Sequence, residues 1–197
     1  MEAAQQLLCT WQLQGKLPLR EVYSIFHGPC PTLQWMKLLL DGVIVPWHAF
    51  ISTLAAHQAL PTVDNICSRG MPMVNRCVLC GSAMETHQHL FFSCPYSNKV
   101  MQGTLTWQGI IRRILNLKHK LNKLARYRCK TWRKKLSCCA LAAGIYGLWH
   151  ERNKRIFVGH CRSPDQLLRW IKYCVCLRMY AWQKGILNYD MLNVLIG

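Results

Sequence analysis

Acidic residues are scarce in this chain of 197 residues, which has only four Asp and four Glu. The two that lie nearest one another in sequence are Glu151 and Asp165. Enzymes that cut or join nucleic acids need clustered carboxylates to hold divalent metal ions beside phosphates. The G-x-x-x-x-G-K-[ST] loop and the G-x-S-x-G turn are absent as well. The sequence therefore predicts a protein that is not an enzyme.

Long apolar segments are also lacking. The most apolar run covers residues 136–149, and it is shorter than the roughly 18 residues that a membrane-spanning helix needs. We expect it to form a buried core helix. The first six residues contain one acid and two amides but no basic residue, which disfavours a secretory signal. We therefore expect a nuclear or cytoplasmic protein that is not secreted, in which the twelve Cys stay reduced or bind metal.

Positive charge is abundant but confined to one half of the chain. Residues 1–98 hold five basic and five acidic residues, so the whole net charge of +17 lies in residues 99–197. A field of this strength attracts polyanions or anionic membrane surfaces. Nucleic acid is the commoner of these partners, so we expect RNA or DNA and rank membrane binding last.

The basic residues are densest between residues 112 and 135, where eleven Lys and Arg occur without an acid. Lysine and arginine neutralise phosphates, and rings such as those of Trp132 and Tyr127 can stack on bases. The residues that we expect to contact nucleic acid are Arg112, Arg113, Lys118, Lys120, Lys123, Arg126, Arg128, Lys130, Trp132, Arg133, Lys134 and Lys135. The alternative is a solvated helical face whose charges only maintain solubility.

The pattern of prolines, capping residues and apolar positions is typical of helices. With 51% hydrophobic residues, the chain can bury one substantial core. The predicted helices cover residues 33–40, 46–60, 62–70, a segment that begins at Pro95, residues 110–124 and residues 163–185. Pro46 suits a first helical turn, Ser163 begins a capping box, and Gly185 can end the last helix.

A compact cluster of candidate metal ligands lies in the middle of the chain. Residues 77–94 follow the pattern C-x2-C-x8-H-x4-C. Two Cys separated by two residues can bind one ion from a tight turn, and Gly81 gives the backbone freedom that such a turn needs. The predicted ligands of one structural Zn²⁺ are Cys77, Cys80, His89 and Cys94. Four protein ligands close the coordination shell, so no position is left for a catalytic water.

Two alternatives to this ligand set stay open. His87 lies two residues before His89, and the local backbone decides which imidazole faces the thiols. We favour His89 because apolar residues follow it directly. The other alternative is that the thiols are buried free cysteines of an apolar loop, with His89 an incidental core histidine. If an ion is bound, it contributes on the order of 10 kcal/mol to folding, so chelation is expected to unfold this module.

The cysteine cluster also resembles that of a known family. The pattern C-x2-C-G followed by E-x3-H-L-F-F-x-C-P over residues 77–95 is similar to the zinc-binding domain that follows the reverse transcriptase in plant LINE-type (non-LTR) retrotransposons. Residues 149–157 resemble the W-x-E-R-N-x-R-x-F stretch that such proteins often carry. The resemblance extends roughly from Trp11 to Phe157.

The resemblance implies a division of the chain into three parts. Residues 1–21 form an N-terminal lead-in, partly family-like from residue 11. Residues 22–106 form a reverse-transcriptase-type zinc-binding domain with its zinc module at 77–94, and residues 107–197 form a basic helical C-terminal region. The expected fold is mainly α, a helical domain with a small CCHC zinc knuckle inserted between helical halves.

The expected function is that of a non-catalytic zinc-binding domain from a retrotransposon-derived protein, which aids the binding of RNA or DNA. A reverse transcriptase module is the candidate protein partner, and no small-molecule substrate is expected. The alternative is a structural or protein-interaction remnant of a decayed element with no nucleic-acid role.

Overall fold

The computed structural model of this chain describes residues 34–39, 41–111, 116–126 and 131–185. All of them belong to the second of the two units into which the chain divides, residues 34–197. The lead-in expected over residues 1–21 lies outside the described residues. Four residues expected to contact nucleic acid also lie outside them, namely Arg112, Arg113, Arg128 and Lys130, as does Tyr127, whose ring is a candidate for stacking on a base.

The described part of the chain is built from helices and contains no strand. The helices are α3 (Gln34–Leu39), α4 (Pro46–Ala56), α5 (Val63–Cys67), η1 (His89–Ser93), α6 (Pro95–Trp107), α7 (Leu117–Arg126), α8 (Thr131–Phe157) and α9 (Pro164–Gln183). The Cys and His cluster of residues 77–94 lies between α5 and α6. This arrangement confirms the predicted mainly α fold with a small zinc-ligand cluster between helices.

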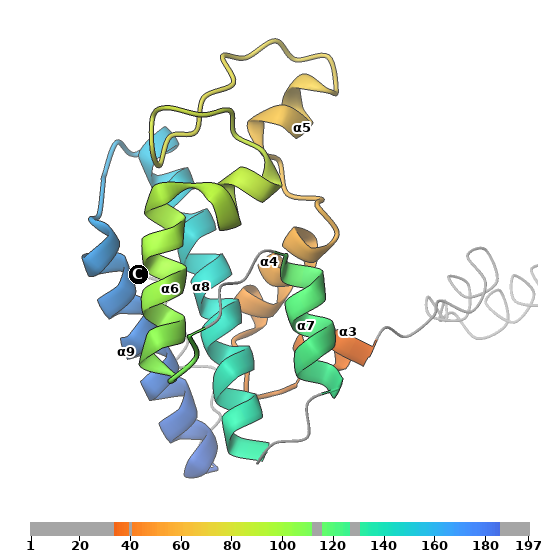
Figure 1. Cartoon of the computed structure of the whole chain (residues 1–197), viewed down its shortest axis with the longest axis vertical. Helices are drawn as coiled ribbons and strands as arrows, with labels where there is room; N and C mark the ends of the chain where they lie inside the picture. Colours follow the sequence, from red (N-terminus) through yellow and green to blue (C-terminus); the bar gives the residue numbers. More distant parts are fainter. Residues whose placement is uncertain (1–33, 40, 112–115, 127–130, 186–197) are drawn as a thin grey trace, which may run out of the picture. The chain divides into compact units, whose positions relative to one another are not determined.

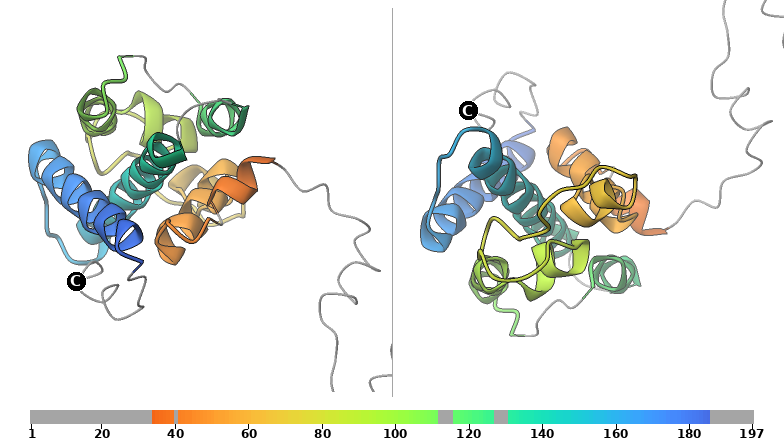
Figure 2. Two further views of the ribbon diagram at one scale, coloured as in Figure 1. Left: turned by 90° about the horizontal axis from the view of Figure 1, so that it is seen from below. Right: turned by 90° about the horizontal axis from the view of Figure 1, so that it is seen from above.

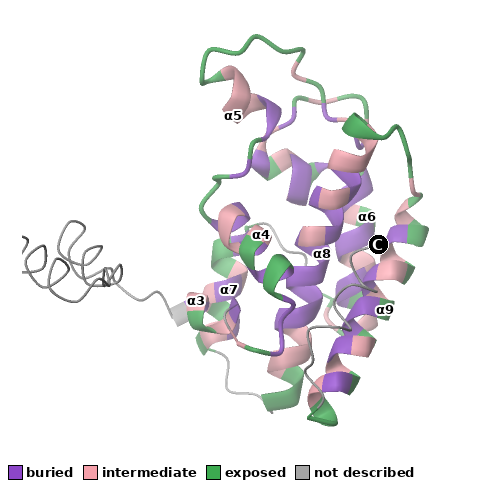
Figure 3. Ribbon diagram, turned by 180° about the vertical axis from the view of Figure 1, so that it is seen from behind, coloured by how far each residue is buried: buried purple, intermediate pink, exposed green. Residues whose placement is uncertain are grey.

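The longest helix, α8, forms the centre of this unit (Figures 1 and 2). It packs against α3, α4, α6, α7, α9 and η1. Small residues permit this packing: a Cβ added at Gly147 would lie 3.2–3.3 Å from side-chain atoms of Leu167, Trp170 and Ile171 on α9. Residues 138–145 are all buried, which confirms the predicted core helix (Figure 3). Among the described helices, none combines the length and apolar character needed to cross a membrane.

Several predicted helix ends are confirmed. Pro46 and Pro95 lie in the first turns of α4 and α6, where the missing N–H has no intrahelical acceptor. Ser163 and Gln166 form a reciprocal capping box at the start of α9. Gly185, just beyond the end of α9, has a φ of 69°, a left-handed conformation that glycine adopts at little cost. The local sequence therefore defines where these helices begin and end.

The amphipathic helix predicted from residue 110 begins later than expected. Residues 110–111 are not helical, and α7 begins at Leu117. Asn116 explains this start, because its side-chain oxygen accepts a hydrogen bond of 3.0 Å from the main-chain nitrogen of His119. Such a bond satisfies one of the free donors in a first helical turn. The predicted apolar positions within α7 are buried, namely Leu117, Leu121 and Leu124.

Candidate functional site

The four side chains predicted as metal ligands converge at one point. The sulfur atoms of Cys77, Cys80 and Cys94 and a ring nitrogen of His89 all lie within 4.8 Å of one another. In a tetrahedral zinc site, bond lengths near 2.3 Å for sulfur and 2.0 Å for nitrogen place the ligand atoms about 3.5–3.8 Å apart. The group is therefore close to the size that holds one Zn²⁺. Three thiolates and one imidazole are also the ligands of closed, structural zinc sites.

A tight turn supplies the first two ligands. The main-chain nitrogen of Gly81 donates to the oxygen of Cys77 at 2.7 Å, and the nitrogen of Cys77 donates to the oxygen of Ala83 at 2.8 Å. Gly81 has a φ of 69°, which a residue with a side chain adopts only with strain. The glycine predicted to free this turn is therefore required by its geometry.

The other two ligands are positioned by η1 and by the start of α6. The π-helical turn begins at His89, and the main-chain nitrogen of Cys94 donates to the oxygen of His89 at 2.7 Å. Cys94 is also the N-cap residue of α6. One short segment thus sets both ligands, and the metal site continues directly into a helix of the core.

His87, the alternative ligand, is engaged elsewhere. Its Nε2 accepts a hydrogen bond of 3.2 Å from the main-chain nitrogen of Leu60, and its Nδ1 lies 3.2 Å from the hydroxyl oxygen of Thr62. Burial lowers the pKa of His87, so the ring is neutral at physiological pH. The geometry groups His89, and not His87, with the three thiols.

The three thiols differ in how readily they lose a proton. A hydrogen bond from Cys77 lowers the pKa of Cys94 to about 5, and the same interaction, together with burial, raises the pKa of Cys77. Burial opposes ionisation of Cys80, but hydrogen bonds, the first from the Ser82 hydroxyl, lower the pKa of Cys80 to about 7. Zinc binds the thiolate form of Cys. Near neutral pH Cys94 is thus ionised and Cys80 is about half ionised, whereas Cys77 retains its proton until the ion displaces it.

Arg155 connects the zinc module, residues 77–94, to α8. Its Nη1 donates to the main-chain oxygens of Val78 at 3.3 Å and Leu79 at 3.1 Å, in the turn between the first two ligands. Its Nε donates to a carboxylate oxygen of Glu151 at 2.8 Å. Its guanidinium carbon lies 4.5 Å from the centre of the Tyr96 ring on α6. One side chain therefore holds the ligand-bearing turn, α6 and α8 together.

A buried ion pair makes a second connection between the zinc module and α8. Nη2 of Arg152 lies 2.7 Å from Oε1 of Glu85, and the two side chains are 5% and 0% exposed. The main-chain nitrogen of Val63 donates to the same oxygen at 3.0 Å. The guanidinium carbon of Arg152 lies 4.9 Å from the centre of the Trp149 ring. Glu85 thus has a paired charge only because α8 packs beside the zinc module.

Residues 149–157 carry the family-like W-x-E-R-N-x-R-x-F motif, whose pattern alone indicates no role for its two arginines. Arg152 and Arg155 are three residues apart, a spacing that brings side chains together on one side of a helix. Glu85, the one acidic residue of the zinc module, was the matching signal, since a carboxylate that becomes buried needs a counter-ion. Those two features together indicate a contact between the zinc module and α8.

The exposed face of α7 carries three of the predicted basic residues, Lys118, Lys123 and Arg126. At 100° per residue, these side chains span about 140° of the helix surface. The buried leucines of α7 occupy the opposite face, and α7 contains no acidic residue. Within the described part of the chain, no ion pair involves any of the three.

Two other basic residues that were predicted to contact nucleic acid make contacts within the protein. Nζ of Lys135 lies 2.8 Å from a carboxylate oxygen of Asp41 and 5.0 Å from the centre of the Trp182 ring. Nζ of Lys134 donates to the main-chain oxygen of Ala125, near the end of α7, at 3.0 Å. A phosphate must compete with these contacts to bind either lysine, so their nucleic-acid role stays a prediction.

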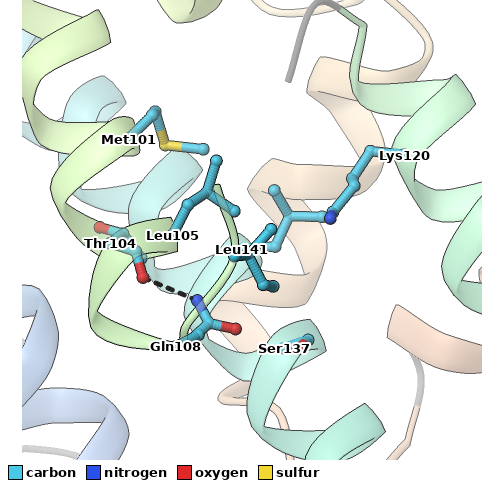
Figure 4. Close-up of a pocket in the computed structure, with 8 residues that line it drawn as sticks. Met101, Thr104, Leu105, Gln108, Lys120, Ser137 and Leu141 are labelled. Carbon is cyan, nitrogen blue, oxygen red and sulfur yellow. Dashed lines mark hydrogen bonds between the residues drawn. The ribbon is translucent and has the colours of Figure 1, made fainter. Parts of the chain in front are cut away.

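Lys120 extends from α7 toward a small cavity between α6, α7 and α8 (Figure 4). The cavity has a volume of about 10 Å³, and Leu105 and Leu141 are among its lining residues. Burial lowers the pKa of Lys120. Gln108 donates to the main-chain oxygen of Thr104 at 2.9 Å, while its own side-chain oxygen has no partner among the described residues. The space holds at most one water molecule, so it is not a ligand site.

The start of α8 adds an aromatic ring to the basic region. Trp132 is 46% exposed, and the guanidinium carbon of Arg133 lies 5.3 Å from the centre of its ring. Arg133 is exposed as well. Both residues therefore remain accessible, as stacking on a base or contact with a phosphate requires.

Comparison with known proteins agrees with this metal centre. Residues 18–100 match a family model described as zinc-binding in reverse transcriptase. No curated protein and no solved structure was found to match the chain. The matched stretch contains all four converging ligands, and it ends before α7, α8 and α9 begin. The family match and the Cys3His geometry together support a reverse transcriptase zinc-binding domain in this chain, with one Zn²⁺ as its cofactor.

Proposed function

We propose that the chain is a non-catalytic domain of a retrotransposon-derived protein, of the plant LINE type that its motifs resemble, and that it binds RNA or DNA through α7 and the start of α8. The observation that carries this proposal is the exposed face of α7. Lys118, Lys123 and Arg126 project from one surface with no acidic residue on the same helix. Such a surface neutralises successive phosphates of a nucleic-acid backbone.

The zinc centre supports this surface from a distance. Arg152 and Arg155 fix the C-terminal half of α8 to the zinc module. The N-terminal end of the same helix carries Trp132 and Arg133, and α7 packs against α3, α4 and α8. Zinc binding thus stabilises the helices that carry the basic residues.

The salt dependence of binding tests this proposal. The zinc-loaded full chain is titrated with a labelled RNA oligonucleotide between about 50 and 200 mM salt, a range over which rising salt steeply lowers an affinity that depends on phosphate contacts. A triple variant, Lys118→Gln, Lys123→Gln and Arg126→Gln, is expected to lower the slope of log K against log salt by about 2 to 3.

A matched triple variant controls for net charge. Arg69→Gln, Arg169→Gln and Lys184→Gln remove the same charge from exposed positions outside α7, and they are expected to leave the slope nearly unchanged. Undetectable binding by the zinc-loaded wild-type chain, or equal losses in the two triple variants, contradicts the proposal.

A second candidate function is protein interaction, and one observation favours it. Trp47 and Phe50 on α4 are 57% and 52% exposed, and their rings lie edge to face with centres 5.9 Å apart. Exposed paired aromatics are common anchors of protein interfaces. If a reverse transcriptase module binds here, a Trp47→Ala, Phe50→Ala double variant weakens its association with the purified module and leaves RNA affinity unchanged.

A further inference from the structure

A polar pocket lies where the end of α4, the zinc module and the start of α7 meet. Its volume is about 230 Å³, which is below the range of roughly 300–1,000 Å³ typical of sites for drug-sized ligands. His57 and Gln58 line it from the turn that follows α4, Phe92 from η1, and Lys118 from α7. The space suits a single flat heterocycle better than a larger metabolite.

The lining of this pocket favours a neutral or anionic ligand that forms hydrogen bonds. None of its lining residues is acidic, and Lys118 contributes a positive charge. Gln58 presents an amide group, which both donates and accepts hydrogen bonds, and Asn116 adds an amide whose oxygen also caps α7. His57 and Phe92 contribute aromatic rings. Amide groups that read base edges and rings that stack on bases are the means by which proteins bind unpaired nucleobases.

Gln58 has an unusual backbone conformation at this pocket. Its φ is +55°, the one positive φ among the described residues other than glycine. The conformation is held from both sides: the nitrogen of Gln58 donates to the oxygen of Ala55 at 3.1 Å, and its oxygen accepts from Nδ2 of Asn65 at 2.9 Å. A residue with a side chain in this region costs about 1–3 kcal/mol, whereas glycine adopts it readily. Strain of this kind is often kept where the side chain itself is needed.

Lys118 links the pocket to the basic face of α7. It lines the pocket and is also one of the three exposed basic residues on that helix. A nucleic-acid backbone that follows Arg126, Lys123 and Lys118 therefore arrives at the mouth of the pocket. The zinc module also lines the pocket, through Phe92.

We propose that this pocket binds one unpaired nucleobase of a single-stranded nucleic acid whose backbone lies along α7. The inference rests on the proposed nucleic-acid function and makes it more specific. In a duplex, each base is paired and stacked, so it cannot enter a pocket without being extruded. The chain therefore prefers a single strand to a duplex of equal length.

Replacing Gln58 by glycine separates a binding role from a structural one. Gln58→Gly removes the amide and relieves the backbone strain, so the thermal stability of the variant is expected to equal or exceed that of the wild-type chain. Its affinity for a single-stranded 12-nucleotide RNA probe is expected to fall by about three- to tenfold through the loss of one or two hydrogen bonds. The salt slope stays unchanged because no charge is altered.

Two further variants sharpen this test. Gln58→Asn keeps an amide on a shorter side chain in a residue that tolerates positive φ, so its affinity is expected to lie between those of the wild type and Gln58→Gly. Gln183→Gly removes an exposed glutamine at the end of α9 and serves as the control, with unchanged affinity.

The result that overturns the inference differs from the one that overturns the proposed function. If the wild-type chain binds RNA with a steep salt slope, but Gln58→Gly binds single-stranded RNA as tightly as the wild type does, the pocket is not a base site. The same conclusion follows if the wild-type chain binds single-stranded and duplex probes with equal affinity, and Gln58→Gly lowers both affinities by the same factor. If the wild-type chain binds neither probe, the proposed function fails, and the base-binding inference fails with it.

Discussion

Arg155 donates a hydrogen bond of 3.1 Å to the main-chain oxygen of Leu79, although 76 residues separate the two. Leu79 lies in the turn between two zinc ligands, and Arg155 lies on α8, beyond the stretch that matches the reverse transcriptase zinc-binding family. The metal centre therefore depends on a helix that the family match does not include. Groups that orient a metal's ligands from outside the coordination shell commonly tune its affinity.

Replacement of Arg155 tests this dependence. Arg155→Met keeps much of the side-chain volume but cannot donate to the oxygens of Val78 and Leu79. Zinc affinity, measured by competition with a chromophoric chelator, is expected to fall about 10- to 100-fold. The visible spectrum of the Co²⁺-substituted variant is expected to change as the ligand-bearing turn loosens. Arg169→Met, which removes the same charge from an exposed position on α9, should keep both the affinity and the spectrum, and a shared loss would contradict the prediction.

The two neighbouring histidines provide a matched pair of variants. His89→Gln removes a group of the Cys3His cluster, and His87→Gln removes a ring that hydrogen-bonds residues 60 and 62. After dialysis against a moderate chelator, the His89 variant is expected to lose most of its zinc. The His87 variant is expected to keep one zinc per chain while losing about 1 to 2 kcal/mol of unfolding free energy. Zinc content by elemental analysis distinguishes them, and the reverse pattern would make His87 the ligand.

The buried Glu85–Arg152 pair is expected to contribute far more to stability than an exposed pair does. Arg152→Met leaves the fully buried carboxylate of Glu85 without a counter-ion, which typically costs about 3–5 kcal/mol. The exposed pair Lys99–Asp165, also 2.7 Å apart with both side chains 59% exposed, provides the control, because Lys99→Met is expected to cost less than about 1 kcal/mol. Urea unfolding of the zinc-loaded proteins measures both. Equal costs would show that Glu85 is not effectively desolvated.

His48 is expected to make the protein less stable in mild acid. The ring is 3% exposed, and burial, with a smaller contribution from Arg178, lowers the pKa of His48 from 6.5 to about 3. Between these two values the unfolded chain binds a proton that the folded chain does not, so the free energy of unfolding falls as the pH falls. The loss from this residue approaches about 1.4 kcal/mol per pH unit.

A His48→Gln variant isolates this contribution, because glutamine does not titrate. Urea unfolding of both proteins at pH 7.5, 6.5 and 5.5, chosen as roughly bracketing the ordinary histidine pKa, should show stability curves that diverge below pH 6.5. Zinc content is measured at each pH, so that metal loss is separated from protonation of His48. Parallel curves for the two proteins would rule out the predicted effect.

Most of the described fold follows from local signals in the sequence. Pro95, the Ser163 capping box and Gly185 each act within one helical turn, and the structure confirms all three. The start of α7 was misplaced because the spacing of apolar residues continues upstream of Asn116, whereas a single capping contact decides where the helix begins. The spacing of apolar residues shows which face of a helix is buried, but it locates the ends of the helix less reliably.

The metal cluster could be predicted because its ligands lie within eighteen residues, from Cys77 to Cys94. The contacts of the basic region could not. Lys135 pairs with Asp41, 94 residues away in sequence, and composition alone does not reveal such a partner. Arg155 contacts main-chain oxygens, which every residue carries, so no side-chain pattern marks them as acceptors.

The separation in sequence between the zinc module and α8 also sets the order in which the two form during synthesis. Arg155 hydrogen-bonds the oxygen of Val78, 77 residues earlier. At about 5–20 residues per second, the ribosome completes all four ligands several seconds before it reaches Arg155. The nascent segment can therefore capture its ion first, and α8 then docks onto a turn already shaped by metal. The supply of zinc during translation thereby influences the fraction of newly made chains that reach the native state.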